Sequence, residues 1–145
     1  MKKETDLNHY IGGSQLQVIR AACKGEEGGY FRQMISALEK RITAMPKTYD
    51  TDGMGDAAPV TLHYFNGSSD WWIIERDAGD ADDEIPDLQS QAFGFTCING
   101  DKRNAELGYI SIEELIRLGV EIDLYFTPKT LGETKEKLGL LHSSH

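Results

Sequence analysis

One cysteine and one histidine in this chain could form a nucleophile and its general base. Cys97 lies in the β-rich segment QAFGFTCI at 91–98, and His63 lies in VTLHYF at 60–65. Such a pair needs contact between the two side chains and a carboxylate that orients the imidazole. A packed cysteine and a hydrogen-bonded histidine are the commoner outcome, and no G-x-S-x-G, HExxH, P-loop or G-x-G-x-x-G motif occurs. We therefore expect no catalytic residue.

Six carboxylates stand close together in the segment DAGDADDEIPD, and clustered carboxylates are ligands for Ca²⁺. They are Asp77, Asp80, Asp82, Asp83, Glu84 and Asp87. An EF-hand loop beginning at Asp77 needs glycine at its sixth position and glutamate at its twelfth, but Asp82 and Leu88 stand there. We therefore expect no metal and no cofactor. A solvated loop and a surface for a basic partner are the two other interpretations.

Residues 50–87 hold the negative charge of the chain. They contain eleven acidic residues and one basic residue, Arg76, which gives −10, while the full chain has a formal net charge of −9. Because phosphate backbones repel such a surface, we expect no direct nucleic-acid binding. A negative surface attracts basic proteins and speeds their association at low salt. We expect the six carboxylates to bind a protein with a basic surface, such as a nuclease or a DNA-binding complex.

Three aromatic residues join the carboxylates as predicted partner-binding residues. Trp71 and Trp72 are adjacent in a predicted strand, so their side chains point to opposite faces of a sheet. If helices cover only one face, the other face still carries one tryptophan and Phe65. Aromatic side chains beside charged groups are typical anchors of protein interfaces. In the alternative interpretation, terminal helices or the second copy of a homodimer cover that face.

Helical periodicity predicts two helices in the first third of the chain and two short helices near its end. Ser14 and Gln17 predict the start of the first helix, which ends by Gly25. The strongest pattern runs through 31–45, and Pro46 ends it. Two pairs with capping-box spacing predict the short helices, Ser111 with Glu114 and Thr130 with Glu133.

Alternation with a period of two predicts about five strands. The segments are 60–65, 71–76, 91–98, 105–110 and 120–126. Asn66-Gly67 joins the first two as a hairpin, and successive hairpins favour a mainly antiparallel sheet with three to four helices mostly on one face. We predict an α+β fold in a single domain, residues 1–145. Within it, we predict an acidic loop at 77–90 and flexible tails at 1–13 and 140–145.

The composition indicates a cytoplasmic protein without membrane contact. No run approaches the ~20 apolar residues that span a bilayer. The basic start, MKKETDLNHY, has no apolar segment after it, so it does not resemble a secretory signal. Cys23 and Cys97 lack CxxC or metal-binding spacing, and we expect both thiols to stay reduced.

The phrases LGYIS at 107–111 and DLYFTPKTL at 123–131 are the most specific in the chain, and MPKTY at 45–49 and SDWWIIERD at 69–77 accompany them. With these phrases, about residues 40–135 resemble an uncharacterised family of small proteins carried by conjugative plasmids, integrative elements and phages. The resemblance implies an accessory protein of a mobile genetic element in a bacterial host cell. It carries over no catalytic residues.

Three hypotheses about function follow. Mobile elements often encode small acidic proteins that block restriction or CRISPR nucleases, some by imitating the charge of DNA. The leading hypothesis is therefore a non-enzymatic protein-binding module that inhibits a host nuclease-type defence, as an anti-restriction or anti-CRISPR protein. The second is an accessory subunit for plasmid conjugation or replication machinery. The third is a small enzyme that uses Cys97 or His63.

Overall fold

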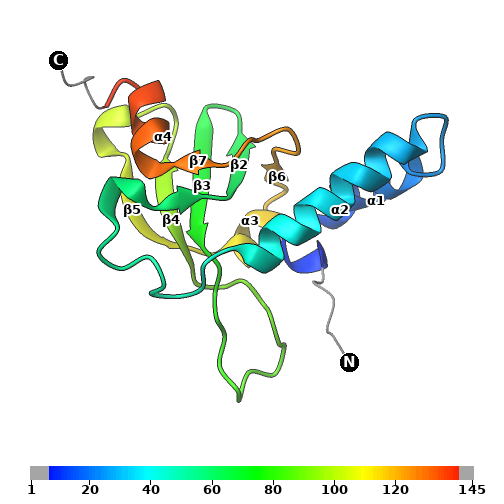
Figure 1. The fold of residues 1–145 in the computed structure, drawn as a ribbon, viewed down its shortest axis with the longest axis horizontal. Helices are drawn as coiled ribbons and strands as arrows, with labels where there is room; N and C mark the ends of the chain where they lie inside the picture. The colour runs from blue at the N-terminus through cyan, green and yellow to red at the C-terminus, as the bar shows by residue number, and fades with distance from the viewer. Residues whose placement is uncertain (1–6, 141–145) are drawn as a thin grey trace.

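Five antiparallel strands form the central sheet of the computed structural model, which describes residues 7–140 (Figure 1). Their order across the sheet is β5-β4-β3-β2-β6. The strands are β2 (Leu62–Asn66), β3 (Ser69–Glu75), β4 (Ala92–Cys97), β5 (Glu106–Ile110) and β6 (Glu121–Ile122). A separate ribbon pairs β1 (Pro59–Val60) with β7 (Lys129–Thr130).

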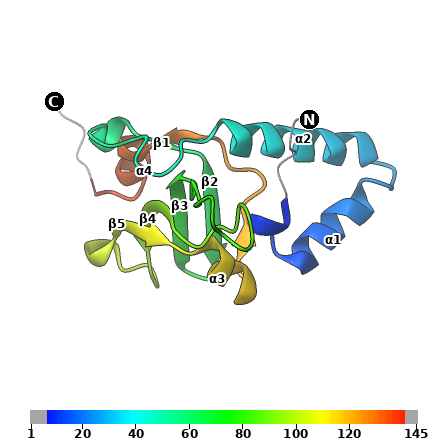
Figure 2. The same cartoon turned by 90° about the horizontal axis from the view of Figure 1, so that it is seen from below.

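Residues 7–140 also contain four α-helices. They are α1 (Gly13–Ala22), α2 (Gly28–Ala44), α3 (Ile112–Arg117) and α4 (Leu131–Lys137). Short 3-10 turns occupy Leu7–His9, Gly55–Ala57 and Lys102–Asn104. Figure 2 shows α4 and β1 on one side of the sheet and α3 on the other, while α1 and α2 form a hairpin that projects from the end opposite β5. The predicted α+β fold with a five-stranded sheet is confirmed.

Each face of the sheet is covered by its own apolar core, because successive strand residues point to opposite faces. Leu62, Tyr64 and Ile73 face the larger core, which α1, α2 and α3 complete. Trp72 and Phe95 face the smaller core, which α4 and the β1–β7 ribbon complete. Within residues 7–140, no helix has the length and apolar character that crossing a bilayer requires.

The predicted strand at 120–126 is wrong beyond its first residues. Only Glu121 and Ile122 pair with β2, and Asp123 then turns the chain by accepting a hydrogen bond from the Tyr125 backbone N–H at 3.0 Å. Ile122 belongs to the larger core and Phe126 to the smaller one. The alternating pattern therefore reflects a chain that crosses from one core to the other.

Two predictions about the N-terminal region are also corrected. A flexible tail was predicted at 1–13, but residues 7–11 are part of the ordered fold, because Leu7, Tyr10 and Ile11 are buried in the larger core. Helix α1 begins at Gly13 with Gly12 as its N-cap, so Ser14 caps nothing. The tail predicted at 140–145 falls outside the described residues from 141 onward.

The two edges of the sheet differ. At β6, the Gln15 side chain accepts a hydrogen bond from the Ile122 N–H at 3.0 Å and donates one to the Ile122 carbonyl at 2.9 Å. This amide occupies the same backbone groups that an added strand would need. At the other edge, β5 pairs with β4 and with no other strand of residues 7–140.

Two buried tyrosines connect the N-terminal segment to the sheet. The Tyr64 hydroxyl donates to the Tyr10 carbonyl at 2.5 Å, and both side chains are fully buried. Burial raises the pKa of Tyr10 to about 12, although the nearby Arg76 guanidinium opposes that shift. Burial also raises the pKa of Tyr64 well above its ordinary value. The fold therefore favours the neutral form of both side chains.

This arrangement predicts a loss of stability at alkaline pH. An unfolded tyrosine ionises near pH 10, whereas native Tyr10 keeps its proton to about pH 12, so its contribution is complete below pH 10 and is lost as the pH rises toward 12. We expect Tyr10→Phe to remove about 2–3 kcal/mol of this pH-dependent loss. Urea unfolding across that pH interval measures the effect. If the free energy of unfolding falls with pH at the same slope in the wild type and in Tyr10→Phe, the prediction is contradicted.

Candidate binding surface

The acidic loop, residues 77–90, connects β3 to β4 and projects from the molecule (Figure 1, green). Gln89 closes its base and is fully buried. The Gln89 side-chain carbonyl accepts from the Asp77 N–H at 2.7 Å, and its NH₂ group donates to the Asp87 carbonyl at 3.0 Å. One side chain thus ties both ends of the loop together, a role that no local sequence pattern predicts.

Two of the six carboxylates also shape the loop from within. Asp77 accepts hydrogen bonds from the backbone N–H groups of Gly79 at 2.8 Å and Gln91 at 3.0 Å. Asp83 accepts from the Asp80 N–H at 2.7 Å. Such side-chain to backbone bonds are how aspartate stabilises turns. The loop therefore has a defined conformation that its own acidic residues help to set.

Four of the six carboxylates of the acidic loop face solvent. Asp80, Asp82, Asp83 and Glu84 are exposed, while Asp77 and Asp87 at the base are half-buried. Among residues 7–140, no group of three or more His, Cys, Asp or Glu side chains is arranged to hold a metal ion. The structure thus brings all six predicted carboxylates onto one loop, with four concentrated at its tip.

The three predicted aromatic residues lie elsewhere. Trp72 is buried in the smaller core at 8% exposure, so it is not available to a partner. Phe65 is exposed and lies on the same face of the sheet as Trp72. It pairs with Asp70 and therefore lies next to the turn that joins β2 to β3. Trp71 is half-buried on the opposite face. None of the three lies on the acidic loop, because the loop leaves β3 at the opposite end from the hairpin turn.

His63 lies between two aspartates that the sequence did not identify. Its Nε2 atom is 2.8 Å from Oδ1 of Asp70, and its Nδ1 atom is 3.1 Å from Oδ2 of Asp123. The ring stacks on Trp72, with centroids 5.2 Å apart and an interplanar angle of 11°. Both ring nitrogens therefore have carboxylate partners, and only a doubly protonated ring can donate to both.

Cys97 does not contact this histidine. Cys97 pairs with Asp70 on β3, so β3 separates the thiol from His63 on β2, and two strand spacings amount to about 10 Å. Burial raises the pKa of the Cys97 thiol, and the nearby Asp70 and Asp101 raise it further. Both effects disfavour the thiolate, which is the nucleophilic form. The geometry gives no support to a Cys97–His63 pair.

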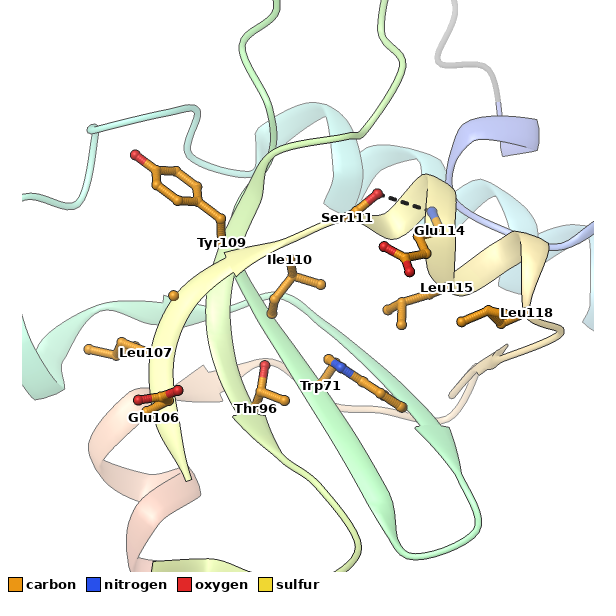
Figure 3. A pocket seen from close by; sticks show the side chains of 11 residues that line it. Trp71, Thr96, Glu106, Leu107, Tyr109, Ile110, Ser111, Glu114, Leu115 and Leu118 are labelled. Carbon is orange, nitrogen blue, oxygen red and sulfur yellow. Dashed lines mark hydrogen bonds between the residues drawn. The ribbon is translucent and has the colours of Figure 1, made fainter. Parts of the chain in front are cut away.

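A groove of about 400 Å³ lies beside β5 on the face that carries Trp71 (Figure 3). We call it the β5 groove. Its floor includes Trp71, Thr96 and Gly108, and α3 forms one wall with Leu115 and Leu118. Glu106 and Glu114 also line it. The sequence predicts Trp71 as an interface residue but gives no sign of the groove, because the groove exists only through the position of α3 against the sheet.

Comparisons with known proteins find no relative of this chain. No protein-family model matches the chain, no curated protein matches it, and no solved structure matches it. The resemblance to the family of mobile-element proteins therefore stays a prediction. Function is inferred from the two surfaces described above, the acidic loop and the β5 groove.

Proposed function

We propose that this protein is a non-enzymatic binding module that attaches to a basic surface of a partner protein through its acidic loop. The observation that carries the proposal is the concentration of Asp80, Asp82, Asp83 and Glu84 on an exposed loop whose base is fixed by Gln89. A loop with a defined conformation loses less conformational entropy on binding than a disordered one. The loop can therefore present negative charge without a large ordering cost.

The charge distribution favours protein over nucleic acid as the partner. Residues 50–87 carry −10, and their single basic residue, Arg76, is half-buried at the base of the loop. Phosphate backbones are repelled by such a surface, whereas lysine- and arginine-rich surfaces are attracted to it. Proteins that bind nucleic acids present basic surfaces of this kind. A host nuclease-type defence protein fits this requirement, as the resemblance to mobile-element proteins also suggests.

Capture from a bacterial lysate at low salt tests the proposal. The bait is the wild type, next to the double variant Asp82→Lys/Glu84→Lys, which reverses charge at the tip of the loop. The control is Glu26→Lys/Glu27→Lys, which makes the same change in net charge at exposed positions in the α1–α2 turn, far from the loop. Bound proteins are identified by mass spectrometry.

We expect the wild type and the control to retain the same basic protein, and the loop variant to retain at least ~10-fold less of it at about 50 mM salt. A nuclease or restriction subunit would support inhibition of host defence. A partner encoded by the same mobile element would support the accessory role in conjugation or replication. Equal capture by the wild type and the loop variant would contradict the proposal.

A further inference from the structure

The outer edge of β5 is open. Strand order places β5 at the end of the sheet, and β4 is its sole strand partner in the described part of the chain. An open edge presents backbone N–H and C=O groups to which another extended chain can pair. The opposite edge, at β6, is closed by the Gln15 side chain. The protein thus protects one edge of its sheet and leaves the other available.

The residues of β5 do not discourage pairing. Protected edge strands usually carry lysine, proline or a bulge. β5 reads Glu106-Leu107-Gly108-Tyr109-Ile110, without lysine or proline, and it pairs with β4 in continuous register. Leu107 is 43% exposed and Tyr109 is 61% exposed. These two side chains point to the face opposite Trp71, so an added strand meets apolar surface on both of its faces.

The β5 groove adds a side-chain site next to this edge. Figure 3 shows the Trp71 indole facing Leu115 and Leu118 across the groove, with Glu106 near one end and Glu114 near the other. Leu118 is 68% exposed, and both glutamates are exposed. Apolar side chains of Trp71 and the α3 leucines, with a carboxylate at each end, match an extended segment whose groove-facing side chains are an apolar residue between two lysine or arginine residues, each two positions away.

We propose that β5 binds an extended segment of a partner protein by strand addition, with apolar side chains in the β5 groove and basic side chains beside Glu106 and Glu114. A second copy of this chain fits less well. Pairing β5 with its two-fold mate would bring the Glu106 and Glu114 carboxylates of both copies to one interface, between chains that each carry −9. Like charges gathered at one interface oppose association.

This surface is separate from the carboxylates at the loop tip, so strand addition does not require the proposed role of the acidic loop. The two surfaces are nevertheless connected. The Glu113 N–H in the first turn of α3 donates to the Gln89 carbonyl at 3.0 Å, which ties one wall of the groove to the base of the loop. One partner that carries a basic surface and an extended segment can contact both.

Gly108 provides a substitution that blocks the groove with little effect on the fold. A Cβ atom at this position has no heavy atom within 4 Å, and the residue has no left-handed backbone conformation. Gly108 lines the groove, so Gly108→Trp fills it with an indole. Circular dichroism and the urea midpoint of the variant establish that it folds as the wild type does.

The experiment is selection of a library of random linear peptides displayed on phage, with wild-type protein as the target. We expect the enriched peptides to carry an apolar residue with lysine or arginine two positions before and after it, because every second side chain of a strand points to the same face. Binding of a synthetic copy should weaken at least ~10-fold with Gly108→Trp. Methylation of alternate backbone nitrogens of that peptide should weaken binding similarly, because it removes the donors that strand pairing uses without any change to the protein.

The two proposals fail separately in this assay. Strand addition is overturned if no peptide is enriched, or if the enriched peptides bind Gly108→Trp and the wild type equally. It is also overturned if the wild type sediments as a dimer that Gly108→Trp converts to a monomer, since a second copy then occupies β5. Peptides that lose affinity for Gly108→Trp but keep it for Asp82→Lys/Glu84→Lys would support strand addition even if the acidic loop has no partner.

Discussion

Replacing Gly94 by alanine is expected to destabilise this protein by about 3 kcal/mol or more, or to prevent folding. A Cβ atom on Gly94 would lie 2.0 Å from the carbonyl oxygen of Trp72 and 3.0 Å from its carbonyl carbon. Both belong to the backbone of β3, the strand at the centre of the sheet. The register of β3 against β4 shifts between Ile73 and Glu75, directly beside this contact. Relief of the clash therefore requires the two strands to separate.

Gly108 supplies the matched control for this prediction. Gly108 pairs with Gly94 across β4 and β5, but a Cβ atom there meets no atom within 4 Å. Gly108→Ala should change the free energy of unfolding by no more than about 0.5–1 kcal/mol. Urea unfolding followed by tryptophan fluorescence measures both variants. Closely similar midpoints for Gly94→Ala and Gly108→Ala would show that the close approach of the two strands is not as described.

Glu75→Leu is expected to destabilise the protein by about 3–5 kcal/mol. Glu75 is 4% exposed, and its carboxylate accepts hydrogen bonds from the Tyr49 N–H at 2.9 Å, the Thr51 N–H at 3.0 Å and the Thr51 hydroxyl. Leucine has a similar volume but accepts none of these bonds. The Thr51 N–H and hydroxyl would then be left without partners in a buried site, and the Tyr49 N–H in a part-buried one, which costs more than the bonds themselves contribute.

Glu75→Gln tests the same site more gently. Glutamine keeps one oxygen acceptor, but its NH₂ group points a donor at a backbone N–H or the threonine hydroxyl. We expect the free energy of unfolding of Glu75→Gln to lie between that of the wild type and that of Glu75→Leu. Hydrogen exchange of Glu75→Leu should show that Tyr49 and Thr51 lose protection before β3 does, because Glu75 accepts hydrogen bonds from both of their backbone N–H groups. Uniform loss of protection in both regions would contradict that role.

The sequence predicted the fold well where local signals agree with tertiary structure. The Asn66-Gly67 hairpin, the end of α2 before Pro46 and the Thr130–Glu133 capping box are all present. It failed at 120–126, where alternation arises from a chain that crosses between two cores. Local patterns do not reveal which of two cores a side chain enters.

The candidate surfaces were only partly predictable for the same reason. The carboxylates of the acidic loop are adjacent in sequence, so their clustering could be read directly. The pairing of His63 with Asp123 joins residues on β2 and beyond β6, and the β5 groove combines β3, β5 and α3. No local pattern encodes such contacts. The fully buried Gln89 was missed because glutamine in a polar segment gives no sign of burial.

The most direct test of the acidic loop as a binding surface is its association rate with the captured partner at increasing ionic strength. We predict that the rate constant of the wild type falls at least ~10-fold between about 50 and 500 mM salt. Asp82→Lys/Glu84→Lys should associate slowly at low salt, and Glu26→Lys/Glu27→Lys should follow the wild type. Equal rates for the wild type and the loop variant, with no dependence on salt, would contradict the proposed role of the loop.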